Sequence, residues 1–204
     1  MASVKLTKNE LKNQKDRLEQ FERYLPTLQL KQQQLQSVMM QLDAQCGELE
    51  KRRERAISGL SHWIAVYSEN TSFDEERRLE NLVVPDNVVC AEENIAGVTV
   101  PVFRELTFRD IDYEPEDYPL WVDTGIQKLK DIAEIDARLK VLAISRQRLG
   151  DELRVTSQRV NLFEKVKIPE TRENIRVIGI YLGDQQTSAV VRGKIAKKKL
   201  QVSP

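Results

Sequence analysis

The sequence predicts an all-α protein: a long antiparallel two-helix coiled coil whose connector holds a short helix and a small β-hairpin. Charged residues make up 31% of the 204 residues and aromatic ones only 6%, with 8 glycines and 7 prolines. This composition is typical of long helices that have more surface than interior. Apolar residues also recur every seven positions in both halves of the chain, which is the pattern of a coiled-coil seam. The middle of the chain interrupts that pattern with prolines and β-prone runs.

The first coiled-coil helix is expected within residues 1–71. Thr7 and Glu10 form a capping box that marks its start. At 1.5 Å per residue, a helix over residues 8–70 would span roughly 95 Å. Pro26 removes a backbone donor and should kink the helix near its start. Two core positions of the repeat are occupied by Val4, Leu11, Leu18, Leu25, Gln32, Met39 and Cys46, and by Phe21, Leu28, Leu35, Leu42, Leu49, Ala56 and Trp63.

The connector is expected over residues 72–118. Ser72 with Glu75 caps a short helix that runs to about Leu82. Two β-prone runs, residues 87–91 and 98–102, flank a turn that contains Gly97, which predicts a β-hairpin. Pro101 limits its strand to an edge of the sheet or to a strand end.

A second coiled-coil helix, with a basic tail, is expected over residues 119–204. Pro119 suits its first turn, and Pro169 breaks its apolar register. Its seam is formed by Ile132, Ile135, Leu139, Leu142, Leu149, Leu153, Val160 and Phe163, followed in a new phase by Ile175, Ile178, Leu182 and Ala189. Two striped helices joined by a short connector bury their stripes by packing antiparallel. We therefore expect opposed residues to have numbers that sum to about 195–200, which places Pro26 level with Pro169 and Gly47 level with Gly150.

Charge is distributed unevenly along a chain whose formal net charge is zero. Residues 1–17 carry a formal charge of +3 and residues 190–204 one of +5, whereas residues 72–119 hold thirteen acids and four arginines, a formal −9. If both termini meet at one end of the hairpin, that end is basic and the opposite end is acidic. Two ends of opposite charge suit different partners.

The sequence contains no catalytic constellation. His62 is the single histidine, and no nucleophile or orienting acid is spaced to meet it. The phosphate-binding pattern G-x-x-x-x-G-K-[ST] does not occur, and the acids around Glu114 lack EF-hand spacing. Cys46 and Cys90 match neither a metal-ligand nor a disulfide pattern. We therefore expect a protein that is not an enzyme and binds no cofactor and no metal.

Membrane and export signals are also missing from the sequence. No run of 18 apolar residues occurs, and the first residues lack the apolar core of a signal peptide. We expect a cytoplasmic location without direct membrane insertion. The lysine-rich tail lacks the aromatics that nucleic-acid binders interleave with their basic residues, so no nucleic-acid partner is expected.

Three segments resemble one known family. The opening KLTKNELKNQKDRLEQFERYLPTLQLKQQQLQ, the connector ENIAGVTVPVF and the later RVNLFEKVKIPETRENIRVI are similar, in this order, to the D subunit of V-type (vacuolar/archaeal-type) rotary ATPases. Pro26 and the short, charged connector resemble the bacterial form. The resemblance implies a non-catalytic central-stalk protein, the axle of the rotor, that couples ATP hydrolysis or synthesis to ion translocation, such as proton transport, through a membrane ring.

The resemblance also implies partners and the surfaces that bind them. The expected partners are the catalytic A and regulatory B subunits of the hexamer, the F subunit, and the C/d socket of the membrane ring, which makes the chain peripheral to the membrane. The expected hexamer-binding tip comprises Lys5, Lys8, Lys12, Arg192, Lys194, Lys197 and Lys198. The expected level of the F subunit comprises Gly47, Gly150, Cys46 and Arg146, and the expected foot comprises Asp112, Glu114, Glu116, Asp117 and Gly97.

Two other classes of protein fit parts of the pattern. A prefoldin-like chaperone arm also joins two helices at a β-hairpin, but it clamps clients with exposed apolar tips, whereas the free tip predicted here is basic. A coiled-coil tether could hold anionic lipid or nucleic acid through the lysine-rich tail. Both remain alternatives at the level of sequence.

Overall fold

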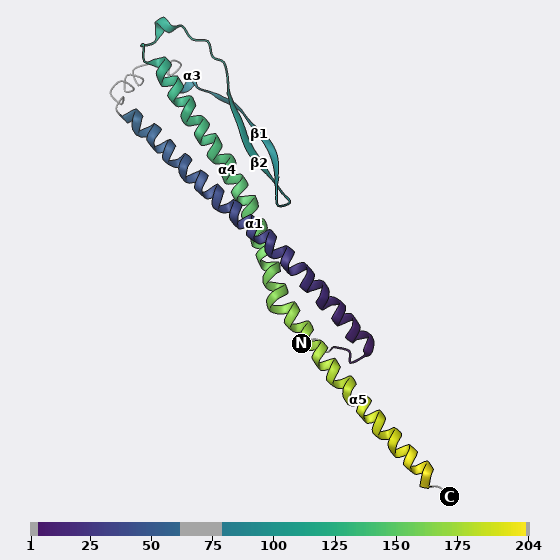
Figure 1. Cartoon of the computed structure of the whole chain (residues 1–204). Helices are drawn as coiled ribbons and strands as arrows, with labels where there is room; N and C mark the ends of the chain where they lie inside the picture. Colours follow the sequence, from purple (N-terminus) through teal and green to yellow (C-terminus); the bar gives the residue numbers. More distant parts are fainter. Residues whose placement is uncertain (1–3, 62–78, 203–204) are drawn as a thin grey trace. The chain divides into compact units, whose positions relative to one another are not determined.

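The computed structural model describes residues 4–61 and 79–202. Figure 1 shows long helices and a β-hairpin. The elements, in chain order, are α1 (Lys8–Ser61), α3 (Leu79–Leu82), β1 (Pro85–Ile95), β2 (Val98–Phe108), η3 (Pro115–Asp117), α4 (Val122–Leu162), the π-helix η4 (Phe163–Lys167) and α5 (Ile168–Val202). Mostly helical structure with one small antiparallel sheet is as predicted. The predicted cap at Ser72 and Glu75, and the end of the first helix near residue 70, lie outside the described residues.

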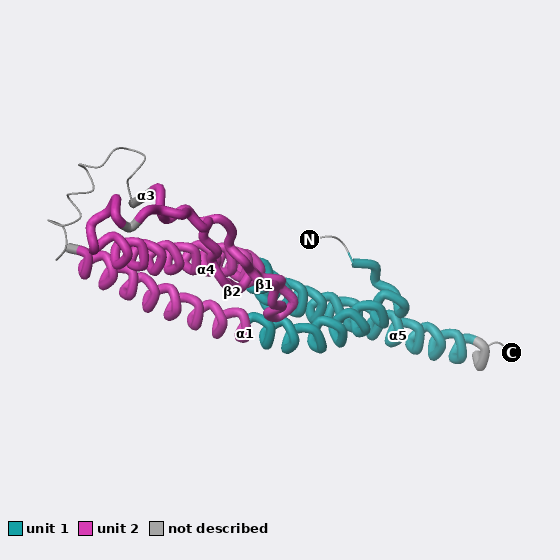
Figure 2. Tube along the Cα trace, turned by 90° about the horizontal axis from the view of Figure 1, so that it is seen from above, with its two compact units in different colours: residues 1–32, 155–204 teal, residues 33–154 magenta. Residues whose placement is uncertain are grey.

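The chain divides into two compact units, coloured separately in Figure 2. Unit 1 comprises residues 1–32 and 155–204, and unit 2 comprises residues 33–154. α1 and α4 each contribute to both units, whereas α5 lies entirely in unit 1. The three domains predicted from the sequence, with boundaries at residues 71/72 and 118/119, are continuous segments of the chain, whereas unit 1 combines two distant segments. The three-domain division stays a prediction.

The start of α1 follows from its capping residue. The backbone N–H of Glu10 donates to Thr7 Oγ1 over 3.2 Å, which is one half of the predicted capping box. The Glu10 carboxylate accepts instead from Gln14 Nε2, at 2.8 Å. Pro26 lies inside α1, which continues through it; the predicted kink stays a prediction.

The β-hairpin is longer than its two predicted runs. Each strand has 11 residues, and the turn between them holds Ala96 at φ 51° and Gly97 at φ 83°. Two consecutive left-handed residues are the geometry of a type I′ turn, whose twist matches that of the strands. The side-chain Oδ1 of Asn94 accepts from the Gly97 N–H at 3.0 Å and secures the turn.

Pro101 lies in the middle of β2, opposite Glu92. A two-stranded sheet has only edge strands, so this position agrees with the restriction that proline imposes. The Pro101 carbonyl accepts from Ser145 Oγ on α4, at 2.7 Å, and therefore points away from β1. At such a position the backbone makes no hydrogen bond to the neighbouring strand. The missing N–H of proline therefore removes no hydrogen bond from the sheet.

The described residues of unit 2 form two apolar clusters. One combines Leu35 of α1, Val100 of β2 and Leu149 of α4, all nearly fully buried. The other forms where Leu82 of α3 meets Val122 and Ile126 of α4. The hairpin thus completes a core that the two helices share, rather than projecting from the connector.

Unit 1 contains the π-helix. The Ile168 N–H donates to the Phe163 carbonyl, five residues back instead of four. Pro169 follows at once, and in a regular α-helix its ring would clash with the carbonyl four residues before it. The wider turn accommodates this ring, and Thr171 Oγ1 donates to the Lys167 carbonyl at 2.6 Å. The change in the apolar pattern predicted at Pro169 therefore comes from one residue that the π-turn adds. The helix itself continues through this turn.

Within each unit α1 runs antiparallel to α4 or α5, but the predicted register is wrong. The contacts that join these helices are Arg53–Asp136, Asp43–Arg146, Gln32–Ser157, Glu22–Arg172 and Phe21–Phe163. Their residue numbers sum to 184–194, whereas 195–200 was expected. The Asp43–Arg146 pair shows that Gly47 is not level with Gly150. The matched level of Pro26 and Pro169 stays a prediction. The prediction paired the two helix ends, but α5 extends past the start of α1. A regular coiled-coil seam stays a prediction.

Candidate partner-binding surfaces

The seven basic residues predicted for the hexamer-binding tip all lie in unit 1 and form two groups. Lys5, Lys8 and Lys12 are exposed at the start of α1, whereas the four basic residues predicted on the tail are exposed on the last turns of α5. Figure 2 shows α5 continuing beyond the beginning of α1. The stretch from Gly183 to Arg192 alone spans about 14 Å of helix. The two helix ends are not level, so the two groups lie apart along unit 1. The single basic tip stays a prediction.

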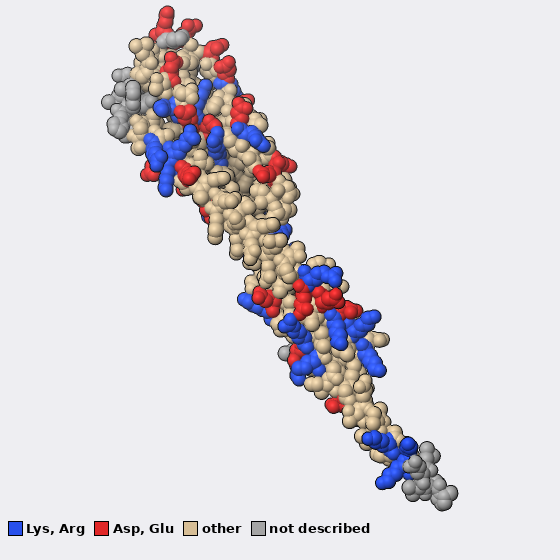
Figure 3. Space-filling model, viewed as in Figure 1, with Lys and Arg blue, Asp and Glu red and all other residues tan. Residues whose placement is uncertain are grey.

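The last part of α5 is an exposed helix. Every described side chain from residue 183 to 199 is exposed. Val190, Val191 and Ile195 are 58%, 48% and 53% exposed, and basic residues lie between and after them. In Figure 3 this part of the molecule is largely tan, and blue side chains gather near its end. Such a surface combines apolar area with positive charge and suits a partner that offers apolar contacts and carboxylates.

The acidic group of unit 2 surrounds η3. Asp112, Glu114, Glu116 and Asp117 are exposed, and red side chains gather at this turn in Figure 3. The turn is held in place by its aromatic residues, because Tyr113 and Tyr118 pack against the Val122 cluster and against each other edge to face, 5.5 Å between ring centres. The four acids are thus presented together by a packed turn.

Tyr113 adds an electrostatic contact at this turn. Its hydroxyl donates to the Asp123 carboxylate. This hydrogen bond, with smaller effects of burial and of the negative charge, raises the pKa of Tyr113 above its ordinary value.

Gly97 lies apart from the four acids with which it was predicted to form the foot, and that foot stays a prediction. Gly97 is in the hairpin turn, whose neighbours Ile95, Ala96 and Val98 pack against the Leu35–Leu149 cluster. The acidic turn packs instead near the start of α4, at Val122. Between Val122 and Leu149, α4 rises about 40 Å. The hairpin folds back along α4 and carries its turn away from the acids.

The four residues predicted at the level of the F subunit are only partly brought together. Arg146 Nε pairs with Asp43 at 2.7 Å, and a shallow hollow beside it is lined by Met39, Ala143, Arg146, Gln147, Gly150 and Asp151. A Cβ added to Gly150 would lie 4.0 Å from Met39 Cε, in ordinary contact, and one added to Gly47 would meet nothing within 4 Å. Gly47 and the half-buried Cys46 lie outside this hollow.

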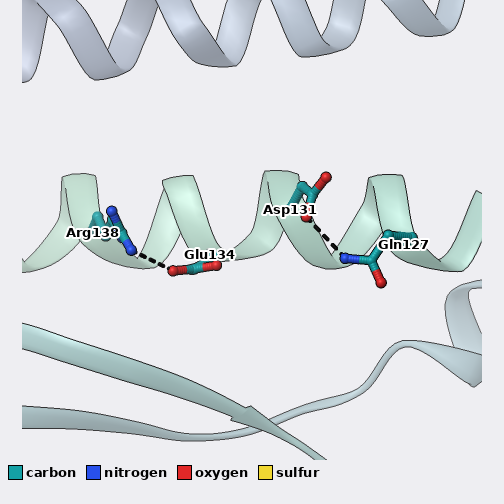
Figure 4. Close-up of polar contacts among 4 residues, drawn as sticks. All are labelled: Gln127, Asp131, Glu134 and Arg138. Atoms are coloured by element: carbon teal, nitrogen blue, oxygen red, sulfur yellow. Dashed lines mark hydrogen bonds and ion pairs between the residues drawn. The ribbon is translucent and has the colours of Figure 1, made fainter.

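A groove between α1, the hairpin and α4 was not predicted. It encloses about 500 Å³ within unit 2 and is mostly apolar, with Glu93, Arg104 and Arg138 among its lining. Figure 4 shows Arg138 pairing with Glu134 along α4, beside the Gln127–Asp131 hydrogen bond. The Arg138 guanidinium also lies 5.1 Å from the Phe103 ring centre, a cation–π contact. The alternation of Val98, Val100 and Val102 is the signal that could have shown a buried strand face, but it does not show what covers that face.

Comparison with known proteins decides the family. A family model described as the D subunit of ATP synthase matches residues 10–198. The chain belongs to this family. Its relatives include the V-type ATP synthase D subunit of Borreliella burgdorferi, 46% identical over 200 residues, covering 98% of this chain and 96% of the relative. That of Chlamydia abortus is 36% identical over 201 residues, covering 98% and 95%, and that of Chlamydia trachomatis is 32% identical over 204 residues, covering 98% and 97%.

This result confirms the resemblance drawn from the three sequence segments. The chain is a non-catalytic subunit of a V-type rotary ATPase, and the chaperone-arm and tether alternatives are set aside. None of the helices that the structure describes is long and apolar enough to cross a membrane.

Proposed function

We propose that this protein is the central-stalk axle of the rotary ATPase and couples ATP hydrolysis or synthesis in the A and B hexamer to ion translocation through the membrane ring. The observation that carries the proposal is the last part of α5. An isolated helix of this length is marginal in water without tertiary contacts, and here it leaves both apolar and basic side chains exposed. A cavity in the hexamer would supply the missing contacts.

The internal contacts of each unit suit the transmission of torque. Ion pairs join α1 to α4 in unit 2 and α1 to α5 in unit 1, so rotating one helix pulls the other. An axle whose faces differ contacts the catalytic interfaces differently in each orientation. Rotation then biases their conformations, and ATP turnover drives rotation in return.

We also propose sites for the remaining partners. The hollow at Arg146 and Gly150 is the candidate site for the F subunit, without Gly47. The acidic turn around η3 is the candidate contact with the C/d socket, and the hairpin turn at Gly97 is not part of it. In this arrangement the axle is peripheral to the membrane, on its cytoplasmic side.

A truncation tests the axle. In a chain ending at Gly183, every removed side chain from residue 184 to 199 is exposed, so the truncated chain should keep its fold. We expect its affinity for the reconstituted hexamer to fall at least tenfold, and ion pumping by the whole complex to be lost. The matched control replaces Asp112, Glu114, Glu116 and Asp117 by Asn or Gln, and should keep hexamer binding while attachment to the ring weakens. A truncated chain that binds and pumps like the wild type would refute the proposal.

A further inference from the structure

We propose that the open edge of β1 binds an extended, basic segment of another protein of the ATPase complex, which pairs with it as a third strand. The proposal rests on the chain being part of that complex. Its starting point is an 11-residue strand at the edge of a two-stranded sheet. Such an edge offers a row of unpaired backbone donors and acceptors.

The contacts of β2 establish which backbone groups point outward. The carbonyls of Thr99 and Pro101 accept from Arg148 and Ser145 of α4, at 3.1 and 2.7 Å, so the outer edge of β2 is covered. In an antiparallel ladder, residues opposite each other point outward together. Asn94 is opposite Thr99 and Glu92 is opposite Pro101.

The same alternation continues by one more pair, Cys90 opposite Phe103. The N–H and C=O groups of Asn94, Glu92 and Cys90 therefore point away from β2. Among the described residues, no hydrogen bond outside the ladder involves these three N–H groups. The intervening Ala91 and Glu93 point inward and pair with Val102 and Val100.

The side chains of β1 indicate which kind of segment can pair with this edge. β1 contains Asp86, Glu92 and Glu93 and no basic residue, and its Val88 and Val89 are 40% and 39% exposed. A second copy of β1 would bring acids close to acids, which destabilises a strand pair. A strand that carries Lys or Arg beside small apolar residues complements both features. Since α4 holds β2 in place and β1 pairs with β2, the open edge of β1 is already ordered before a partner binds.

Hydrogen exchange followed by mass spectrometry, at single-residue resolution, tests the pairing in the intact protein. We compare the isolated chain with the purified ATPase. The outward amides of Cys90, Glu92 and Asn94 should exchange at least tenfold more slowly in the complex. The inward amides of Ala91 and Glu93 should be protected in both samples and serve as the internal control.

Substitutions test the mode and the charge of binding. E92P removes an outward N–H at a position where proline is compatible with the ladder, as Pro101 is opposite it, and should abolish the protection of Cys90 and Asn94. E92A keeps the N–H and should retain at least part of the protection. The double variant E92K/E93K should reduce it several-fold if the occupant is basic.

The outcomes separate this proposal from the assignment to the ATPase. If the chain co-purifies with the ATPase but the three amides stay unprotected, strand pairing is wrong and the assignment stands. If the chain does not co-purify, both are wrong. Protection that already appears in the concentrated isolated chain would show a second copy as the occupant, and protection that survives charge reversal would exclude a basic one. Either result overturns the occupant proposed here.

Discussion

At the scale of single residues, Ser145 decides how the hairpin is held. Its side chain is only 3% exposed, and its hydroxyl contacts both the Pro101 carbonyl of β2 and, at 3.2 Å, the Val141 carbonyl of its own helix. A serine within a helical pattern has no sequence signal that distinguishes this role from an exposed position. Its function as an anchor follows only from the hairpin that lies against it.

Replacing Ser145 with alanine should destabilise unit 2. The Pro101 carbonyl would lose its donor, which costs about 1 kcal/mol. We expect a lower midpoint of urea unfolding and faster exchange of the Val100 and Val102 amides. Ser37→Ala, at an exposed position of α1, is the matched control and should stay within about 0.5 kcal/mol of the wild type. Equal effects of both changes would contradict the anchoring role.

Tyr113 should make stability depend on alkaline pH. Its pKa is raised in the folded chain, so its contribution is fully present below the unfolded tyrosine pKa of about 10 and is lost as the pH rises through the folded value. The free energy of unfolding should therefore decrease less steeply above about pH 10 in Tyr113→Phe than in the wild type. Ultraviolet difference titration of the two proteins would show at which pH the Tyr113 hydroxyl titrates. Curves of unfolding free energy against pH that coincide for the two proteins would exclude the effect.

At the scale of elements, η4 sets which face of α5 is buried. An α-helix turns about 100° per residue, so the residue added by the π-turn rotates the rest of α5 by that amount. With this rotation Thr171 and Ile178 lie on the buried face of α5, where their side chains are 5% and 0% exposed. The sequence showed the change of phase at Pro169, but the apolar pattern did not reveal that the helix continues through a wider turn.

Deleting Val166 together with Pro169→Ala should restore an unbroken α-helix and yet destabilise unit 1. The rotation would remove Ile178 from the core, which we expect to cost about 2–4 kcal/mol. Pro169→Ala alone should be neutral or stabilising, since it restores a helix donor. Thermal unfolding of the two variants checks this. A deletion variant as stable as the single substitution would show that η4 does not set the helix phase.

At the scale of the whole molecule, the register between the long helices is tested by crosslinking. With Cys46 and Cys90 replaced by serine, cysteines at Gln32 and Ser157 should react with a short bifunctional thiol reagent, because these side chains are 2.9 Å apart. Cysteines at Gln32 and Lys165 should react poorly, although the register expected from the sequence places them level. A higher crosslinking yield for Gln32 with Lys165 than for Gln32 with Ser157 would support the register expected from the sequence.

Local signals in the sequence were enough to predict the helices, the hairpin turn and the family. These signals are apolar periodicity, the capping box at Thr7, and residues such as Gly97 that tolerate positive φ. The register, the return of the hairpin along α4, and the separation of Gly97 from the acidic turn became visible only in the folded chain. The physical reason is that continuous apolar stripes bury nearly the same area in many registers. The choice among them falls to contacts distant in sequence, such as Asp43 with Arg146 and Pro101 with Ser145.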